Sequence, residues 1–360
     1  MFMNVTLDNI IFSIQKAGGI SVVWYEHVKR LLQDPNFKPQ FIEYANALNN
    51  VFRKELPISN EDIINKWSVA LKYWKYLDIY GNGSEPYIFH SSVYRIDHNK
   101  SALNVVTVHD FAYERYVKGY RQVINSFSKF GSIRKADAVI CISESTKRDL
   151  LTYVPGVDES KIKIVYNGVG SDYFPMTQIQ HTIDIPFDDK EFVLFVGNRR
   201  DYKNFKAALV TCKELGLPLV IAGGEVFTEN ETAELNSYLP QSRYYITGKI
   251  SNSELNELYN RAGVLLYPSQ FEGFGIPVLE AQRAGCPVVC LSLSSIPEVM
   301  GISDYCLIDT SFDSITDAVR ILFNDSDSRN KEIERGFTNA ARFSWDKTYQ
   351  GTTEVYKTLL

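Results

Sequence analysis

Long apolar runs, cysteine pairs and clusters of metal ligands are missing from this 360-residue sequence. No stretch approaches the roughly 20 apolar residues that cross a bilayer. The first residues, MFMNVTLDNIIF, contain neither a basic region nor a small-residue cleavage site, so we expect no signal peptide. The five cysteines form no CxxC pair, and with the five histidines they show no zinc-ligand spacing, so we expect no metal site. Few unpaired cysteines are typical of a reducing compartment, and we expect a cytoplasmic protein.

The length and the charge distribution indicate two unlike halves. A chain of 360 residues is too long for one ordinary core and suits two domains. Residues 1–170 carry a net charge of +4 and the remainder carries −9. Most of this asymmetry is expected on solvated surfaces, but it also indicates that the first half meets something anionic.

Short apolar segments alternate with helical patterns along both halves. The expected strands lie at 1–12, 40–45, 87–90, 104–109, 137–142, 161–166, 191–196, 218–222, 243–246, 264–267 and 287–291. Helical patterns between them include 22–32, 113–135 and 203–215, and the tail from 343 to 360 is amphipathic. This order predicts an α/β protein with two doubly wound parallel sheets facing each other. Ligands of such sheets bind beyond the carboxyl ends of the strands, here in the cleft between the halves.

The most informative stretch runs from residue 264 to 290, VLLYPSQFEGFGIPVLEAQRAGCPVVC. It predicts a strand, a polar loop, a helix and a second strand, with Glu272 in the loop and Glu280 about one turn into the helix. Gly275 and Pro277 stand at the helix start, where glycine allows close backbone approach and proline costs no hydrogen bond. Such a helix start holds phosphate through its N–H groups and its dipole. An ordinary β-α-β turn is the alternative interpretation of the same pattern.

Three features of the first half also stand out. Gly18 and Gly19 precede a helix without GxGxxG spacing, so they are either a simple turn or an opening for a phosphate or sugar. His109 and Asp110 follow a buried strand, where the histidine is either structural or a hydrogen-bonding partner of a substrate that Asp110 orients. Lysines and aromatics alternate over residues 66–80, which suits either a membrane surface or a helix that buries its aromatics.

Several segments in one order resemble the retaining glycosyltransferases of family 4, which have the GT-B fold. The resemblance is strongest in ITGKISNSELNELYNRAGVLLYPSQFEGFGIPVLEAQRAGCPVV, residues 246–289. AGGIS (17–21), VHD (108–110), KIKIVYNGV (161–169), VGNRRDYKN (196–204) and FSWD (343–346) fall in the family's order. The resemblance implies two Rossmann-like domains facing across a cleft. Residues 1–172 would bind the acceptor, 173–342 would bind the nucleotide sugar, and 343–360 would form a helix that packs back on the first domain.

The resemblance also implies roles for individual residues. Glu280 would bind the ribose hydroxyls, and Glu272 would lie near the donor sugar. His109 would contact the transferred sugar, and Lys203 would neutralise the diphosphate. The implied backbone contacts to the diphosphate come from the N–H groups of Phe274, Gly275 and Ile276 and from the loop at Gly18 and Gly19.

One position departs from the family pattern. Many members have an arginine five residues before the lysine, and here that position is Asn198. A lysine alone cannot fork two phosphate oxygens as arginine does. Arg199 or Arg200 would supply the missing cation, and we favour Arg199 because it is nearer in sequence. The segment RRDYKN (199–204) resembles the same loop in mannosyltransferases and related O-antigen transferases. This resemblance favours GDP-mannose as donor.

The expected reaction is transfer of a hexose from a nucleotide-diphosphate sugar to a glycan or lipid-linked acceptor, as in O-antigen, capsule or other cell-surface polysaccharide synthesis. By resemblance the anomeric configuration is retained. No Asp-x-Asp motif follows a strand, so we expect no metal or other cofactor. A lipid-linked acceptor suggests peripheral contact with the inner face of the plasma membrane, and no nucleic acid is expected. The alternatives are a sugar-nucleotide epimerase of the same architecture and a non-catalytic module that binds sugar nucleotides.

Overall fold

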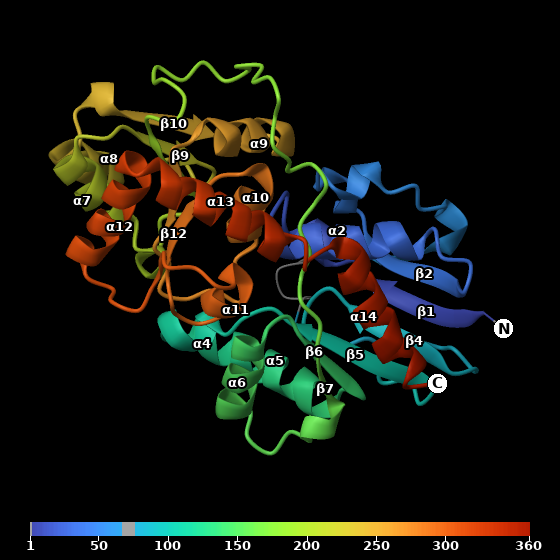
Figure 1. Cartoon of the computed structure of the whole chain (residues 1–360). Coiled ribbons are helices and arrows are strands. Elements are labelled where there is room, and N and C mark those ends of the chain that lie inside the picture. Colours follow the sequence, from blue (N-terminus) through green and yellow to red (C-terminus); the bar gives the residue numbers. More distant parts are fainter. Residues whose placement is uncertain (1, 67–75) are drawn as a thin grey trace. The chain divides into compact units, whose positions relative to one another are not determined.

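Two parallel sheets, each flanked by helices, organise the chain in the computed structural model, which describes residues 2–66 and 76–360. The chain divides into two compact units (Figure 1). Unit 1 contains Met1–Gly168 and Trp345–Leu360, and unit 2 contains Val169–Ser344. Within the described ranges, no helix combines the length and the apolar content needed to cross a membrane.

Unit 1 is built on a seven-stranded sheet with the order β3-β2-β1-β4-β5-β6-β7. The paired strands run parallel, and β1 lies beside β2 and β4, so the chain reverses its direction of winding at β1. The strands are β1 (Met3–Asp8), β2 (Phe37–Tyr44), β3 (Ile63–Lys66), β4 (Tyr87–Ser91), β5 (Ala102–Val108), β6 (Ala138–Cys141) and β7 (Ile162–Ile164). The apolar side chains of the central strands are buried on both faces, as expected for a parallel sheet covered by helices, whereas Ile64 of the edge strand β3 is exposed.

The helices of unit 1 are α1 (Ile11–Ile14), α2 (Gly19–Leu31), α4 (Ala112–Tyr116), α5 (Tyr120–Lys135), α6 (Glu144–Tyr153) and α14 (Trp345–Lys357). The C-terminal helix α14 packs against α2 and contributes Val355 and Tyr356 to the core that also contains Trp24 and Val28. Thr348 donates a hydrogen bond to the Tyr166 carbonyl at 2.8 Å. The last helix of the chain is therefore an integral part of the first unit.

The segment expected to form one helix over 113–135 forms two. The helix α4 ends at Tyr116 and α5 begins at Tyr120. Gly119 lies between them with φ +88°, a conformation that glycine adopts without strain and that cannot continue a right-handed helix. The apolar periodicity continues across this break, which explains why the sequence pattern suggested one element.

Unit 2 is built on a six-stranded sheet with the order β10-β9-β8-β11-β12-β13. Its strands are β8 (Val193–Val196), β9 (Leu219–Ala222), β10 (Tyr244–Gly248), β11 (Val264–Tyr267), β12 (Val288–Leu291) and β13 (Cys306–Leu307). Its helices are α7 (Phe205–Leu215), α8 (Glu229–Tyr238), α9 (Asn252–Arg261), α10 (Ile276–Ala284), α11 (Ile296–Met300), α12 (Phe312–Asn324) and α13 (Ser326–Ala340). The winding direction reverses at β8, which pairs with both β9 and β11.

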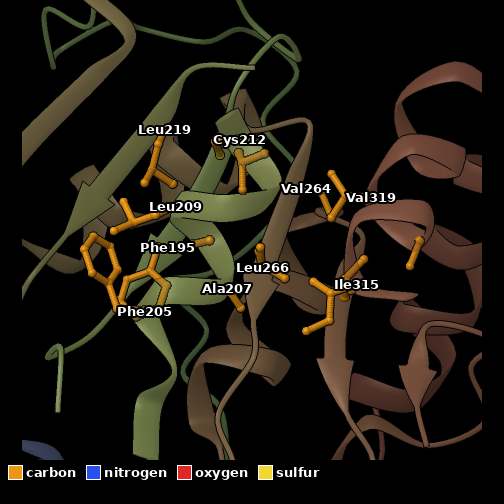
Figure 2. Packing of buried hydrophobic residues seen from close by; sticks show 14 of the residues in the cluster. Phe195, Phe205, Ala207, Leu209, Cys212, Leu219, Val264, Leu266, Ile315 and Val319 are labelled. Carbon is orange, nitrogen blue, oxygen red and sulfur yellow. The ribbon is translucent and has the colours of Figure 1, made fainter. Parts of the chain in front are cut away.

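Apolar side chains of the central strands β8, β9, β11 and β12 and of the helices α7 and α12 meet in one core, shown close up in Figure 2. Phe195 and Phe205 stand edge to face with ring centroids 5.0 Å apart, a favoured aromatic geometry. Leu266 of β11 and Ile315 of α12 belong to the same cluster. This packing fixes β11 and α7, whose ends carry the residues of the predicted donor site.

The segment expected as a linker, 175–186, is held along unit 2 rather than left free. Glu257 accepts hydrogen bonds from Thr182 N–H at 2.9 Å and from its hydroxyl at 2.5 Å. Asn260 accepts from the Met176 N–H at 2.7 Å. Side chains of α9 thus satisfy the backbone of this irregular segment, and the break between the units lies at Gly168 and Val169.

Candidate functional site

The loop between β11 and α10 brings several predicted residues to the carboxyl end of a central strand of unit 2. Gly275 caps α10 with φ +110° and ψ +48°. A Cβ atom at this position would lie 2.7 Å from Cδ1 of Ile296, so a larger residue would both strain the backbone and clash. Pro277 occupies the first turn of the helix, as expected from the sequence. The backbone at the start of α10 is therefore held in one shape.

Two serines that precede α11 hold the backbone of this loop through hydrogen bonds. The Ser294 hydroxyl accepts a hydrogen bond from the Glu272 N–H at 2.8 Å. The buried Ser295 hydroxyl lies 2.9 Å from the Glu272 carbonyl and 2.8 Å from the Phe274 carbonyl. Ser294 has φ +51°, a left-handed conformation that is uncommon outside glycine and asparagine. Nothing local to these serines in the sequence shows which backbone they contact.

The Glu280 carboxylate is held by two tyrosines. The Tyr259 hydroxyl of α9 donates to Glu280 Oε2 at 3.0 Å, and Tyr173 donates a second hydrogen bond. Burial raises the pKa of Glu280 to about 7, and the two tyrosine hydroxyls oppose that shift. Glu280 is thus oriented by two neutral donors. Neither tyrosine was predicted, because they come from segments far away in the sequence.

Glu272 and Lys203 form an ion pair. The Lys203 ammonium lies 2.5 Å from Glu272 Oε1, and both side chains are largely buried. The Tyr267 hydroxyl donates to the same oxygen at 2.6 Å. The Gln270 N–H donates to the Tyr202 carbonyl at 2.7 Å, which ties the loop of Lys203 to the loop of Glu272. The two predicted donor-site residues therefore lie in direct contact, and the ammonium is placed by a carboxylate and a phenol.

In the basic loop after β8, Arg199 has several partners within unit 2. Its guanidinium donates to Glu231 at 3.0 Å and to the Glu225 carbonyl at 2.7 Å, and it stacks 3.7 Å from the Phe227 ring centroid. Only 3 % of its side chain is exposed. The guanidinium is therefore engaged in holding the loop before α8.

Arg200 is the other basic residue of this loop, and its side chain is exposed. The Asn198 side chain accepts a weak hydrogen bond from the Arg200 N–H at 3.4 Å, which is a local turn contact. Lys203 does not begin α7 as expected. It lies in a short 3-10 turn (Asp201–Lys203), and Asn204 with φ +52° separates that turn from the helix.

His109 lies just beyond the end of β5 in unit 1. Burial lowers the pKa of its imidazole to about 4, and the nearby Lys129 charge lowers it further, while Asp110 acts in the opposite direction. The ring is therefore neutral at pH 7. The Asp110 carboxylate accepts from the Ala112 N–H at 2.9 Å and so caps the start of α4. Asp110 acts on His109 as a nearby charge, while its hydrogen bond to the Ala112 N–H stabilises a helix end.

A cavity of about 250 Å³ adjoins His109 within unit 1. It is lined by the ends of β5 and α2 and by one side of α4 and α5, including Gln15, Ile20, Tyr113, Asn125 and Lys129. Gly18 and Gly19 lie next to this lining at the start of α2. No atom lies within 4 Å of the position of a Cβ on Gly19, so open space borders the first turn of this helix.

His90, at the end of β4, has polar partners on two other elements of unit 1. Its Nδ1 lies 2.6 Å from the Tyr356 hydroxyl and its Nε2 lies 2.9 Å from Thr107 Oγ1. The Tyr356 hydroxyl also lies 2.8 Å from His27 Nε2. Burial lowers the pKa of both histidines, that of His27 to about 3. These neutral rings join α14 to the sheet.

No group of three or more histidine, cysteine, aspartate or glutamate side chains in residues 2–66 and 76–360 is arranged to hold a metal ion. The five cysteines are free thiols, four of them buried. The predicted site residues thus fall into two groups. Glu272, Glu280, Lys203 and the start of α10 belong to unit 2, whereas His109 and the glycine pair belong to unit 1.

Two family models match the chain and together span most of it. Residues 178–338 match "Glycosyl transferases group 1", and residues 17–173 match "Glycosyltransferase Family 4". The chain belongs to this family of glycosyltransferases. Its relatives include O-antigen chain mannosyltransferase B of Escherichia coli, 25 % identical over 291 residues that cover 76 % of this chain and 74 % of the relative.

Other relatives have different lengths and different names. The serotype-specific mannosyltransferase WbdA of Escherichia coli is 26 % identical over 247 residues, but the match spans only 30 % of WbdA and 65 % of this glycosyltransferase. Alpha-maltose-1-phosphate synthase of Mycolicibacterium smegmatis is 25 % identical over 294 residues, which cover 74 % of each chain. These relatives therefore define the family of this chain better than they define the sugar that it transfers.

Solved structures share the whole fold. Sucrose-phosphate synthase from Thermosynechococcus elongatus superposes with a TM-score of 0.75 over 99 % of both chains at 15 % identity. HepE from Anabaena, solved with UDP and glucose, gives a TM-score of 0.73 over 99 % of this chain and 100 % of HepE at 13 % identity. The predicted GT-B fold and the predicted enzyme class, a hexosyltransferase, are confirmed.

Proposed function

We propose that this glycosyltransferase moves mannose from GDP-mannose to a hydroxyl of a glycan or lipid-linked acceptor in the synthesis of a cell-surface polysaccharide. The observation that carries the proposal is the glycine-capped start of α10, with Glu280 one turn into the helix and the Lys203–Glu272 pair beside it. Support for mannose comes from relatives named O-antigen mannosyltransferases.

Unit 2 would bind the donor nucleotide. The ribose hydroxyls would hydrogen bond to Glu280, whose orientation Tyr173 and Tyr259 fix. The diphosphate would bind at the N terminus of α10, beside Phe274, Gly275 and Ile276, where the helix dipole favours negative charge. Lys203 would add a positive charge there, and the exposed Arg200 replaces Arg199 as the candidate for a second cation.

The transfer breaks the bond between the sugar C1 and the β-phosphate oxygen and forms a bond between C1 and the acceptor oxygen. The acceptor proton would pass to the departing diphosphate, so that no protein carboxylate acts as nucleophile and the anomeric configuration is retained. Negative charge develops on the leaving diphosphate, and fixed dipoles and cations stabilise that charge most strongly in a site without water. Glu272 would position Lys203 for this role as well as bind the donor sugar.

Unit 1 would bind the acceptor in the cavity beside His109. A neutral imidazole can donate a hydrogen bond to a sugar hydroxyl or accept one from it. The low pKa of His109 keeps its ring neutral at physiological pH. The loop at Gly18 and Gly19 would contact the donor diphosphate, and the open space beside Gly19 is compatible with that role. We propose that no metal ion takes part, so activity should persist in EDTA.

A thermal-shift screen with GDP, UDP and ADP tests the donor assignment. A nucleotide present at 100 times its Kd should add about 2.7 kcal/mol to the stability of the bound state. We expect GDP to raise the Tm more than UDP or ADP, and GDP-mannose to be consumed when a glycan acceptor is added. A larger shift with UDP would overturn the mannose assignment and leave the enzyme class intact.

Two variants separate binding from catalysis. Glu280→Ala should abolish the GDP shift, because the ribose loses its carboxylate partner. His109→Ala should keep the shift and lose turnover, because it removes the contact to the transferred sugar. An epimerase would instead release an altered sugar nucleotide without acceptor, and a non-catalytic module would show the GDP shift with no turnover of GDP-mannose.

A further inference from the structure

An apolar stripe lies on the outer face of α5, which stands beside α4 in Figure 1. Tyr120, Val123, Ile124 and Phe127 are spaced i, i+3, i+4 and i+7, so they share one face of the helix. Between 46 and 82 % of each residue is exposed. Tyr113 and Tyr116 of α4 are also exposed. Apolar side chains gathered in this way on a surface mark an interaction site.

The opposite face of α5 is the one that packs inside unit 1. Lys129, Ser132 and Ile133 are buried, and Lys129 forms an ion pair with the buried Glu114 at 3.0 Å. The helix thus already has a buried side with its own polar partners. The stripe is therefore additional to the face that the fold uses.

Basic residues outnumber acidic ones in the sequence that contains the stripe. Residues 112–135 contain Arg115, Lys118, Arg121, Lys129, Arg134 and Lys135, with Glu114 as their one acidic residue. Glu114 is buried against Lys129, so it does not offset the exposed charges. Arg115 pairs with Asp149, and Lys135 lies 3.8 Å from Asp78. The exposed surface around the stripe is apolar in its middle and positive at its ends.

We propose that the α4–α5 face, defined by Tyr113, Tyr116, Tyr120, Val123, Ile124 and Phe127, docks on an anionic lipid surface. Aromatic and aliphatic side chains would enter the headgroup boundary, and Lys118 and Arg134 would meet lipid phosphates. A second copy of the chain fits this face less well, because the positive ends of two copies would meet each other. The expected contact through residues 66–80 has its centre at 67–75, outside the described residues, whereas this surface lies within them.

The docking face also borders the acceptor cavity. Tyr113, Asn125, Ser128 and Lys129 of α4 and α5 line the cavity that contains His109. An acceptor anchored in the bilayer would therefore reach His109 along the inner side of the helix whose outer side contacts lipid. This step rests on the lipid-linked acceptor of the proposed function, whereas the docking itself does not.

Flotation of the purified protein with vesicles tests the docking face. Vesicles of phosphatidylcholine with phosphatidylglycerol should bind the protein at low salt, and pure phosphatidylcholine vesicles should bind much less. The double variant Val123→Glu/Phe127→Glu should lose at least about tenfold in bound fraction, because it removes apolar contacts and adds negative charge. The matched control is Ile302→Glu/Ile308→Glu, which changes two exposed isoleucines of unit 2 in the same way and should float as the wild type does.

A GDP-mannose hydrolysis assay without lipid, run on the same proteins, separates this proposal from the proposed function. Turnover of GDP-mannose without flotation would overturn the docking face alone. Flotation that needs Val123 and Phe127 while GDP-mannose is neither bound nor turned over would keep the docking face and reject the function. Light scattering in lipid-free buffer adds a further outcome. If the wild type is a dimer and the double variant is a monomer, the face serves self-association and lipid docking is overturned.

Discussion

The Glu280 carboxyl group titrates near neutral pH, because burial raises its pKa to about 7. If the ribose binds the carboxylate, GDP should bind more tightly as the pH rises through that value. Between pH 6 and pH 8 the ionised fraction of such a group grows about tenfold, and the apparent affinity follows that fraction. Isothermal titration of GDP at pH 6, 7 and 8 should therefore show Kd falling by up to about tenfold.

The control for this prediction is Glu280→Gln, which keeps the shape of the side chain and cannot ionise. GDP has its own titrating phosphate in this range, and the variant retains that contribution, so the difference between the two proteins belongs to Glu280. Tyr259→Phe removes a hydrogen bond that lowers the pKa of Glu280, so it should move the midpoint to higher pH. Parallel pH profiles of wild type and Glu280→Gln would show that this carboxyl does not bind the nucleotide.

Residue identity was easier to predict than residue partnership. Glu272 and Glu280 stood out because a strand, a glycine-bracketed turn and a helix have a recognisable order along the chain, and Lys203 followed from the family resemblance. Their roles stay predictions. Their partners Tyr267 and Tyr259 were not found, since a hydroxyl reaches a carboxylate through the packing of separate elements. Nearness to the missing position favoured Arg199, whose role stays a prediction, but the sequence could not show that Glu231 and Phe227 contact its side chain.

At the level of elements, most strands were predictable because they are short apolar runs between polar turns. The edge strands β3 and β13 were missed, because neither has a fully buried side chain. The break at Gly119 was missed because periodicity reports which face is apolar and not whether the helix is continuous. The family resemblance predicted that α14 attaches to unit 1. The chain of polar contacts that makes this attachment could not be predicted, because it joins residues that are far apart in the sequence. His27, His90 and Tyr356 come from α2, β4 and α14, and no local pattern relates them.

Removing the Tyr356 hydroxyl tests how much this polar chain stabilises the attachment of α14. Tyr356→Phe keeps the ring and leaves buried imidazole nitrogens of His27 and His90 without their partner. An unsatisfied buried polar group costs about 1–3 kcal/mol, so urea denaturation should show unit 1 less stable by about that amount. Tryptophan fluorescence is the suitable probe, because Trp24 lies 5.1 Å from His90, centroid to centroid, and Trp345 begins α14.

A second tyrosine of the same helix provides the control. The Tyr349 hydroxyl donates to Asp34 at 2.8 Å near the surface, where water can replace it. Tyr349→Phe should therefore cost less than about 1 kcal/mol. Equal losses in the two variants would mean that the buried histidines gain nothing from Tyr356.

For the whole molecule, acid should act on the two units in opposite directions. Unit 1 holds three histidines whose pKa is lowered chiefly by burial, to about 3 for His27, to about 4 for His109 and well below 6.5 for His90. Between pH 6.5 and 4 the unfolded chain binds protons that the folded unit does not, so the stability of unit 1 falls as the pH falls. The pKa of buried Asp8 is raised, so this group opposes the loss of stability, but it is one group against three histidines.

Unit 2 carries the reverse linkage in the range from pH 7 to 4.5. Burial raises the pKa of Glu280 to about 7, so the folded unit binds a proton before the unfolded chain does. Lowering the pH through this window should therefore add to the stability of unit 2. All four tryptophans lie within residues 1–168 and 345–360, so their fluorescence reports on unit 1, while calorimetry reports on both units.

The expected result is a single thermal transition, or two close ones, at pH 7.5 and a clear separation at pH 5, with the tryptophan signal melting first. At pH 5 each buried histidine should account for about 1–2 kcal/mol of the loss. His27→Phe removes one titrating ring and should shrink the separation, whereas His181→Gln, which changes an exposed histidine of unit 2, should leave it unchanged. If the melting temperature of the tryptophan transition stays level or rises between pH 7.5 and 5, the buried histidines are not neutral in the folded unit. The proposal that a neutral His109 serves the acceptor site would then be rejected as well.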